Sequence, residues 1–348
     1  MRSADRDSSL QLRAVVGSIA RQGIAWLHAF SGQSARDRAH LDGSCAGILM
    51  YHRVLPLREA RRLHVEPGMF VTPETFTRHL EWLARHFSVL PLHDIVARLR
   101  AGERLPPGAC AITFDDGWRD NHDHALPALA ARRMPATIFV VTDRVGTSGA
   151  FWPDEVCRRL SALDGSSRRS IIRSAGLDLV DGSTPVVLAA LKGLDEKERE
   201  RVFEAIRRVT TDPVDGEREL LDWDELARLA EQRVDIESHA ASHAILTAVS
   251  REQAADELAR SLARLRQSGH ARHALLAYPS GAFDREVVEL ARAAGYRAAF
   301  TTQIGLASGG DDSLCQPRLA VHDDISRTRA EFLRWVPGPA RAVTRERT

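Results

Sequence analysis

The sequence contains little cysteine, little tyrosine and no excess of charge of either sign. Its 348 residues include 4 Cys and 3 Tyr, and 48 Lys and Arg residues nearly balance 47 Asp and Glu residues, which leaves a formal net charge of +1. Proteins that bind nucleic acid through its phosphates carry a concentrated excess of basic residues, so the balanced charge argues against nucleic acid as the main partner. No two cysteines have the C-x-x-C spacing of a zinc site, and four widely separated cysteines do not make the framework of a disulfide-rich domain. Reduced thiols are therefore expected, and they favour a cytoplasmic location.

Long hydrophobic runs are also absent at the N-terminus. The first seven residues mix two Arg with two Asp and no apolar run follows them, so they do not have the pattern of a cleaved export signal. Residues 10–30 are interrupted by Arg13 and Arg21, whereas a bilayer span needs about 20 apolar residues. Because the apolar residues of this stretch recur at roughly helical spacing, residues 1–45 are predicted to form a helical leader that packs on the body or is poorly ordered. The alternative is a basic amphipathic helix in peripheral contact with a membrane surface.

From residue 46 onward, short β-rich runs alternate with amphipathic helical patterns. This alternation indicates parallel strands joined by crossover helices, as in a barrel or a doubly wound sheet. One helix is predicted to begin with Thr72 as N-cap and Pro73 at its first position, and another begins at Asp222, which forms a capping-box pattern with Glu225. The predicted strands are residues 46–51, 109–113, 136–141, 234–237, 274–278 and 298–302, and a third helix covers 252–267.

The alternation stops between residues 152 and 219, where no convincing strand occurs. Seven consecutive charged residues occupy 195–201, a pattern typical of a solvated helix face. The segment is predicted to be a helical insertion in a barrel that spans residues 46–335, with a C-terminal tail at 336–348. The alternative is a lid or substrate-facing subdomain over one mouth of the barrel.

Two adjacent carboxylates directly follow one predicted strand. In residues 111–117 (Ala-Ile-Thr-Phe-Asp-Asp-Gly) the apolar run leads into Asp115 and Asp116, and Gly117 allows the chain to turn there. Successive side chains of a strand point to opposite faces, so both carboxylates face one site only if the chain turns. Active sites of parallel α/β folds lie at this end of the strands. One carboxylate is then a candidate metal ligand and the other a candidate proton acceptor, and the alternative is an Asp-Asp-Gly surface turn.

A pair of histidines follows another predicted strand. The protein has 14 His, and histidine is the commonest metal ligand. His239 and His243 are four residues apart, so on a helical turn capped by Ser238 both imidazoles project from one face and can bind one ion. Two His and one carboxylate leave coordination positions for water and substrate, as in catalytic sites. A lone H-x-x-x-H is more often incidental, but its place after a strand, in a chain that also carries Asp-Asp-Gly, favours metal binding.

A third strand ends in Tyr278-Pro279-Ser280-Gly281. Pro279 restricts the turn, and the backbone N–H of Ser280 is a candidate donor to the oxyanion of a reacting acyl group. Tyr278 and Pro279 are candidate substrate-binding residues. His52, at the end of the first strand, faces the same mouth and is either a further substrate-binding residue or a structural histidine.

Together, these motifs resemble the polysaccharide deacetylase (NodB-homology) superfamily, also called carbohydrate esterase family 4. The resemblance runs from residues 48–54 (Ile-Leu-Met-Tyr-His-Arg-Val) to about Arg318 and includes residues 113–117, 135–140 and 238–243 in that order. It implies a deformed (β/α)7 barrel of the polysaccharide deacetylase type with a helical insertion, and an activity that removes N- or O-acyl groups from sugars.

By position, the resemblance makes Asp115 the catalytic base, and Asp116, His239 and His243 the metal ligands. The implied cofactor is one divalent metal ion, Zn²⁺ first, with Co²⁺, Ni²⁺ or Mn²⁺ as alternatives. Such an ion lowers the pKa of bound water from 15.7 toward ~7 and polarises the acyl oxygen. Asp115 would accept the proton of the water, and the N–H of Ser280 would help to stabilise the oxyanion.

The sequence departs from the best-known family pattern in its later motifs. Ala277 stands where the family usually carries an arginine, Ser280 stands where an aromatic residue is usual, and no Asp-Trp pair occurs in residues 300–305. These departures match a branch in which Tyr-Pro-x-Gly replaces the arginine motif, often met near exopolysaccharide or lipopolysaccharide biosynthesis genes. His322, at the end of Leu319-Ala320-Val321-His322, is the candidate general acid although its spacing differs by one residue, and an ordinary loop histidine is the alternative.

Three functional hypotheses follow. The leading one is a metal-dependent N-deacetylase that acts on an acetylated amino sugar in a polysaccharide or a lipid-linked glycan precursor. The second keeps the fold but hydrolyses a small cyclic or linear amide. The third is a non-catalytic carbohydrate-binding barrel, and the intact set of Asp116, His239 and His243 argues against it.

Overall fold

The computed structural model describes residues 41–148, 151–179, 181–211 and 217–336. The predicted N-terminal leader up to residue 40, with its alternative as a membrane-contacting helix, lies outside the described residues, as does the predicted tail from residue 337 onward. No helix in the described part of the chain combines the length and the apolar character that a bilayer span requires.

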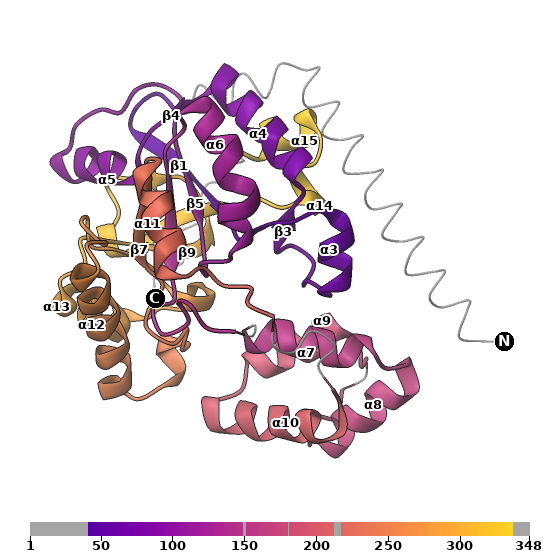
Figure 1. Ribbon diagram of the computed structural model, residues 1–348. Helices are drawn as coiled ribbons and strands as arrows, with labels where there is room; N and C mark the ends of the chain where they lie inside the picture. The colour runs from indigo at the N-terminus through magenta and orange to yellow at the C-terminus, as the bar shows by residue number, and fades with distance from the viewer. Residues whose placement is uncertain (1–40, 149–150, 180, 212–216, 337–348) are drawn as a thin grey trace.

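Seven parallel strands form the centre of the molecule, with helices around them (Figure 1). They are β1 (Cys45–Tyr51), β5 (Ala109–Phe114), β6 (Ala136–Val140), β7 (Val234–Ser238), β8 (Leu275–Ala277), β9 (Ala298–Ile304) and β11 (Gln316–Ala320). Their order is β1-β11-β9-β8-β7-β6-β5, and β5 pairs with β1 to close the ring. Every neighbouring pair in this ring is parallel. The predicted (β/α)7 barrel is confirmed.

Six of the seven barrel strands coincide with predicted strands, and β11 does not. Pro317 and Arg318 interrupt the apolar pattern of β11, because proline cannot donate to a strand ladder and a charged residue is unusual inside one. The shorter strands lie outside the ring: β2 (Arg53–Val54) pairs with β3 (Phe70–Val71), β4 (Ser88–Val89) extends the sheet beside β5, and β10 (Ala307–Ser308) runs antiparallel to β1.

Alternation along the strands separates the barrel interior from the layer that faces the helices. In β5, Cys110 and Ile112 belong to the large core cluster shared with the surrounding helices. Ala109 and Ala111 belong to a second cluster, which also contains Phe139 and Phe300 from other strands and lies inside the barrel. Side chains of a strand alternate with a period of two, so in β5 the odd-numbered residues, such as Ala111, point to the barrel interior.

The helices around the barrel begin where capping residues predict. The Thr72 hydroxyl accepts a hydrogen bond from the N–H of Thr75 at 3.2 Å, and Asp222 and Glu225 form the predicted capping box. These helices are α3 (Leu57–Arg62), α4 (Pro73–His86), α5 (Leu92–Ala101), α6 (Leu126–Arg132), α11 (Trp223–Glu231), α12 (Arg251–Gln267), α13 (Arg285–Ala294), α14 (Asp323–Ser326) and α15 (Arg329–Trp335). Shorter turns are a π turn at Asn121–Ala125 and 3₁₀ turns at Leu246–Ala248, Pro279–Gly281 and Ser313–Cys315.

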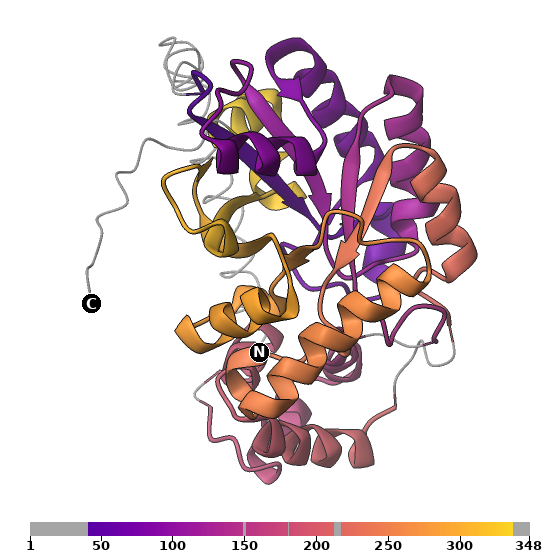
Figure 2. The same ribbon diagram turned by 90° about the vertical axis from the view of Figure 1, so that its left-hand side faces the viewer.

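The segment between β6 and α11 forms a separate group of four helices. They are α7 (Trp152–Ser161), α8 (Gly165–Ser174), α9 (Thr184–Lys192) and α10 (Glu196–Val209). Both views show this group at one end of the barrel, at the bottom of the pictures (Figures 1 and 2). The helices share a buried cluster of their own, which includes Val156, Leu188 and Phe203. The charged run at 195–201 is mostly exposed on α10, as the pattern predicts.

A buried ion cluster joins this insertion to the barrel. Arg158 of α7 pairs with Glu219, Glu219 accepts from Nη1 of Arg53 at 3.0 Å, and Nε of Arg53 donates to Asp120 at 2.9 Å. These side chains are between 1% and 5% exposed. Buried charges are tolerated only when they are paired, so the contact between the insertion and the barrel depends on all four.

Replacing Arg158 by Met should destabilise the protein by about 3 kcal/mol, because it leaves the buried carboxylates with one cation too few. The control is Arg173→Met, which removes an arginine that is 76% exposed in its pair with Asp178 and should cost about 0–1 kcal/mol. Denaturant unfolding of both variants measures the difference. Equal losses of stability in the two variants would contradict the anchoring function of the buried cluster.

Candidate active site

The candidate catalytic and metal-binding side chains gather where the barrel strands end. Asp115 and Asp116 follow β5, His239 and His243 follow β7, and His52 follows β1. Because the strands are parallel, these ends lie at one edge of the barrel. Within the described part of the chain, Asp116, His239 and His243 form a group whose ligand atoms all lie within 4.8 Å of one another. The structure therefore brings together the three predicted metal ligands.

Two residues in the left-handed backbone region turn the chain after β5. Asp116 has φ 75° and Gly117 has φ 79°, so Asp116 departs from the alternation of the strand and can share a site with Asp115. A Cβ on Gly117 would lie 3.1 Å from Cγ1 of Val140, so both space and φ favour glycine there. The indole Nε1 of Trp118 donates to Oδ2 of Asp116 at 2.9 Å, and Oδ1 is left for the histidines.

The histidine pair does not lie on a helical turn, so this part of the prediction is wrong. The segment is an irregular loop in which Ala240 and His243 have φ 61° and φ 71°. The backbone N–H groups of Ala241 and Ser242 donate to the buried carboxylate of Glu257 in α12, at 3.1 and 2.8 Å. Left-handed residues and this anchor, instead of helical spacing, bring the two imidazoles to one carboxylate.

The distances between the three donors suit a metal ion better than direct hydrogen bonds. Nε2 of His239 and Nε2 of His243 lie 3.3 and 3.4 Å from the same Oδ1 of Asp116. An N–H···O bond is commonly about 2.9 Å long, whereas two donors of a tetrahedral ion with bonds of about 2.0–2.1 Å lie about 3.3 Å apart. Nδ1 of His239 bonds to the carbonyl oxygen of Ala277 at 2.7 Å, which leaves Nε2 as the coordinating atom. These residues therefore fit a divalent metal ion.

A buried arginine from β11 lies beside Asp115. Nη1 and Nη2 of Arg318 donate to the two carboxylate oxygens of Asp115 at 2.7 and 2.6 Å, and Nε donates to the carbonyl oxygen of Thr301 at 3.0 Å. The Arg318 side chain is 0% exposed, and bidentate pairs of this kind are the strong ones. Asp115 is thus paired with a guanidinium that comes from another strand of the barrel.

The charges around the two carboxylates favour their ionised forms. Burial alone would raise the pKa of Asp115, but the charges of Arg318 and His239 outweigh burial and lower it. Burial is also outweighed at Asp116, where the close imidazoles of His239 and His243 hold the pKa well below its usual range. Burial lowers the pKa of His243, whereas at His239 the contact with Asp116 overcomes burial and raises the pKa. Arg318 balances the charge of Asp115, so the carboxylate of Asp116 is the negative charge that two neutral imidazoles and a bound cation would share.

The structure changes the interpretation of Tyr278 and Pro279. Tyr278 is fully buried in the helix-facing core, its hydroxyl donates to the carbonyl oxygen of Leu314 at 3.0 Å, and Pro279 is buried as well. Alternation explains this, since Ala277 points to the barrel interior and Tyr278 to the opposite face. The predicted substrate contact of these two side chains is thus corrected to packing. Ser280 has φ 56° on an exposed turn, and its function as an oxyanion donor stays a prediction.

The structure distinguishes the two histidines predicted at the mouth. The charge of His52 contributes to lowering the pKa of both Asp115 and Asp116, so His52 lies close enough to act on both. His322 precedes α14, and its Nδ1 lies 3.3 Å from Asp324. The substrate-binding function of His52 and the acid function of His322 stay predictions.

The insertion reaches the loop that carries the histidines. The ring centroids of Phe151 and His243 lie 4.8 Å apart, and Phe151 immediately precedes α7. Asp154, in the first turn of α7, has its pKa raised to about 7, mainly by burial, with a contribution from the charge of Asp116. The contact between Phe151 and His243 therefore brings the start of the insertion beside the histidine loop, and the alternative in which the insertion is a lid over the barrel mouth stays a prediction.

Four residues that contact or surround the candidate site residues were not predicted from the sequence. Trp118 follows Asp-Asp-Gly directly, and its indole donor was a usable signal. Arg318 stands before an apolar run, and a charged residue inside an apolar strand is a candidate for a buried ion pair. Glu257 and Asp154 carry no local signal, because acidic residues are common on the helices that hold them.

Comparisons with known proteins agree with this geometry. A family model described as polysaccharide deacetylase matches residues 102–299. The curated protein named "Putative polysaccharide deacetylase YxkH", from Bacillus subtilis, is 21% identical over 280 residues, which are 80% of this chain and 72% of that protein. The poly-beta-1,6-N-acetyl-D-glucosamine N-deacetylase of Staphylococcus epidermidis is 30% identical over 79 residues, 22% of this chain and 27% of that protein.

Solved structures show the same fold at low sequence identity. The Streptococcus pyogenes deacetylase PplD superposes with a TM-score of 0.57 and 17% identity, over 84% of this chain and 98% of that chain. IcaB from Ammonifex degensii superposes with a TM-score of 0.56 and 17% identity, over 85% of this chain and 98% of that chain.

Replacing Arg318 by Met should destabilise the protein, and the loss should grow as the pH rises from about 4 to 7. Arg318 lowers the pKa of Asp115 in the folded protein, so its removal raises that pKa and leaves a buried carboxylate uncompensated once it ionises. The expected loss at pH 7 is about 3–5 kcal/mol by urea unfolding. Arg318→Lys keeps the charge without the bidentate fork and should lose less. A loss independent of pH would contradict the pairing.

Replacing Asp154 by Asn should weaken divalent-cation binding at pH 8 and leave it nearly unchanged at pH 6. The pKa of Asp154 is about 7, so its carboxyl group is neutral at the lower pH and adds a negative charge near Asp116 at the higher pH. We expect a loss of about 2- to 10-fold in affinity, measured by competition with a chromophoric chelator. The control is Asp178→Asn, whose carboxylate is 85% exposed on the insertion. Equal losses at both pH values would contradict this electrostatic coupling.

Proposed function

The chain belongs to the polysaccharide deacetylase family and is a carbohydrate deacetylase, and on that premise we propose how it acts and on which substrate. It removes N-acetyl groups from an amino sugar in a polysaccharide or a lipid-linked glycan precursor, with one divalent metal ion held by Asp116, His239 and His243. The observation that carries this proposal is the approach of both Nε2 atoms to one Asp116 oxygen, at 3.3 and 3.4 Å.

Zinc is the first choice of metal, because two imidazoles and a carboxylate suit it, and Co²⁺, Ni²⁺ or Mn²⁺ are alternatives. A divalent ion bound here would polarise the acyl oxygen and acidify the attacking water. Hydrogen bonds to the atoms that face away from the metal site orient these ligands. The indole of Trp118 orients the Asp116 carboxylate, and the carbonyl oxygen of Ala277 orients the ring of His239.

Asp115 is the proposed general base. Arg318 keeps it ionised and holds its plane through two parallel hydrogen bonds, and each carboxylate oxygen retains a further lone pair for a proton. Asp115 takes one proton from the water whose oxygen bonds to the acyl carbon. The sugar nitrogen then gains a proton as its bond to that carbon breaks, which releases the free amine and acetate.

His52 is a better candidate than His322 for the donor of that second proton. His52 follows β1 at the same strand edge as Asp115 and Asp116, and a protonated His52 would lower the pKa of both carboxyl groups, whereas Nδ1 of His322 lies 3.3 Å from Asp324. The N–H of Ser280 remains the candidate donor to the oxyanion at the turn after β8.

The relatives suggest the class of sugar. The Staphylococcus epidermidis relative is named for poly-beta-1,6-N-acetyl-D-glucosamine, and a structural neighbour is the BpsB deacetylase domain from Bordetella bronchiseptica, with a TM-score of 0.51. We therefore place polymers of N-acetylated hexosamine first among the substrates to be tested. The net charge of +1 is compatible with a neutral glycan.

Asp116→Asn should abolish both metal binding at this site and acetate release from N-acetylated hexosamine oligomers. We expect a decrease in rate of at least about 10³-fold, because activation of water and stabilisation of the oxyanion are lost together. Asp123→Asn, an exposed aspartate of the same type, is the matched control and should keep both properties. Persistent acetate release without metal at this site would overturn the proposed mechanism.

The two other hypotheses are tested in the same assay. Hydantoin-like cyclic amides and short linear amides are offered beside the acetylated oligomers, and preferential turnover of the amides would favour the amidohydrolase. Glycan binding without turnover by the metal-loaded protein would favour the binding barrel.

A further inference from the structure

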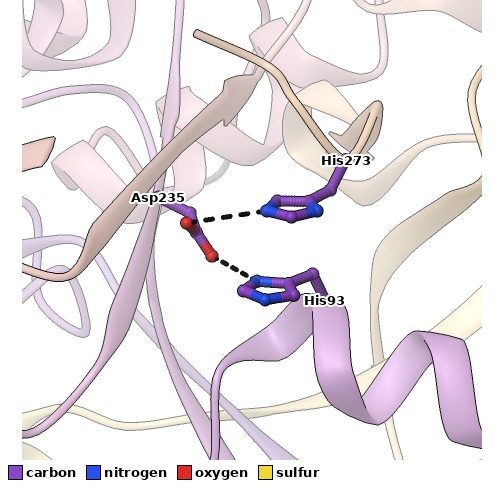
Figure 3. Close-up of side chains that lie close together, drawn as sticks. All are labelled: His93, Asp235 and His273. Carbon is purple, nitrogen blue, oxygen red and sulfur yellow. Dashed lines mark hydrogen bonds and ion pairs between the residues drawn. The ribbon is translucent and has the colours of Figure 1, made fainter.

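A second group of metal-type donors lies at the opposite end of the barrel from Asp115 and Asp116. His93, Asp235 and His273 form another group among the described residues whose ligand atoms all lie within 4.8 Å of one another. His93 is in the first turn of α5, Asp235 is the second residue of β7, and His273 lies two residues before β8. Figure 3 shows the two imidazoles one above the other, with the Asp235 carboxylate facing both.

Only one of the two histidines is hydrogen-bonded to Asp235. Nδ1 of His93 lies 2.7 Å from Oδ2 of Asp235, but Nε2 of His273 lies 3.8 Å from Oδ1, too far for a hydrogen bond. The rings of His93 and His273 are stacked, with centroids 3.7 Å apart and planes 3° apart. Two imidazoles this close cannot both become cations at low cost, because like charges repel. A cation shared by all three donors would instead be stabilised by each of them.

We propose that His93, Asp235 and His273 form a second divalent-metal site, of the zinc class, independent of the deacetylation site. Two imidazoles and a carboxylate are ligands that this class of ion binds. The separations of 2.7 and 3.8 Å bracket the spacing of about 3.3 Å expected between donors of a tetrahedral ion. Because the lone pair of each donor nitrogen lies in its ring plane, the stacked rings must also turn out of their parallel arrangement to bind one ion. Three protein ligands leave a coordination position for water or a small anion.

The surroundings hold these donors in place. The buried carboxylate of Glu237, two residues after Asp235, accepts from the N–H of His273 at 3.1 Å and from the N–H of Leu275 at 2.8 Å. This fixes the segment that carries His273 against the strand that carries Asp235, as contacts outside the ligand shell do in metal sites.

A metal ion here would connect three separate parts of the N-terminal end of the barrel. Helix α5 covers that end, because Leu92, Ile95 and Leu99 join the interior cluster. An ion that binds only the folded arrangement stabilises it by mass action. The cavity beside His93 and His273 is open to solvent, which gives an ion a route of entry. Arg100 and Arg297 also line this cavity, and their positive charges oppose a cation, so the Asp235 carboxylate must outweigh them.

Metal stoichiometry of the untagged full chain tests the proposal. The protein is stripped with a chelator, reloaded with Zn²⁺ and passed through a desalting column. The number of Zn²⁺ ions per chain is then measured by inductively coupled plasma mass spectrometry. Wild type should retain two ions per chain. The double variant His93→Gln/His273→Gln should retain one, the double variant Asp116→Asn/His239→Gln should retain one, and the combination should retain none. His64→Gln changes an exposed histidine outside both groups and should retain two.

The outcomes separate this proposal from the proposed function. A single ion that is lost with Asp116 and His239, and kept without His93 and His273, overturns the second site. A single ion with the reverse pattern supports the second site and contradicts the metal of the deacetylation mechanism. Wild-type protein that retains no ion overturns both.

Asp235→Asn provides a second readout that does not depend on loss of folding. Asparagine keeps the size of the side chain and can accept a hydrogen bond from His93, but it is a weaker ligand. The metal-free proteins should unfold at similar temperatures, whereas Zn²⁺ should raise the Tm of wild type by at least about 3 °C more than that of the variant. An equal increase in both proteins would contradict the site.

Discussion

The ion pair between Arg318 and Asp115 inside the barrel is the interaction on which the active site depends. Both side chains are almost fully buried, and such charges are tolerated only because each satisfies the other. Arg318 also donates to Thr301 of β9 and contacts the hydroxyl of Thr113 at 3.4 Å, so one side chain links three strands across the interior. Closure of the barrel by β11 and the ionised state of the proposed base therefore depend on the same residue.

The two-residue period of the strands decides which side chains can take part in chemistry. Asp115, His239 and Arg318 stand at the inward-facing positions of their strands and meet at the end of the barrel. Tyr278 stands at an outward-facing position and points into the helix layer. The same rule directs Asp235 to the interior at the other end. A barrel of short parallel strands thus presents inward-facing polar groups at both ends, and in this protein both ends collect two histidines and a carboxylate.

The insertion and the active site share charged residues, so they are electrostatically connected. Arg53 stacks over Trp118 with its guanidinium carbon 3.8 Å from the ring centroid, Trp118 holds Asp116, and Arg53 pairs with Glu219. Arg158 of the insertion pairs with the same Glu219. A change in the position of the insertion therefore alters the surroundings of a candidate metal ligand, without any direct contact between Arg158 and Asp116 being needed.

Strand–helix alternation in the sequence predicts parallel strands with crossover helices and six of the seven barrel strands, because periodicity is a local property; the choice of a (β/α)7 barrel came from the family resemblance. The short motifs also single out Asp115, Asp116, His239 and His243 as candidate site residues. The sequence did not determine how the histidines converge, since positive φ at Ala240 and His243 and the anchor at Glu257 replace the expected helical turn. Only the tertiary structure decided that Arg318 partners Asp115 and that His93, Asp235 and His273 meet. These groups are separated by between 38 and 203 residues in the chain, and only barrel closure brings them within reach.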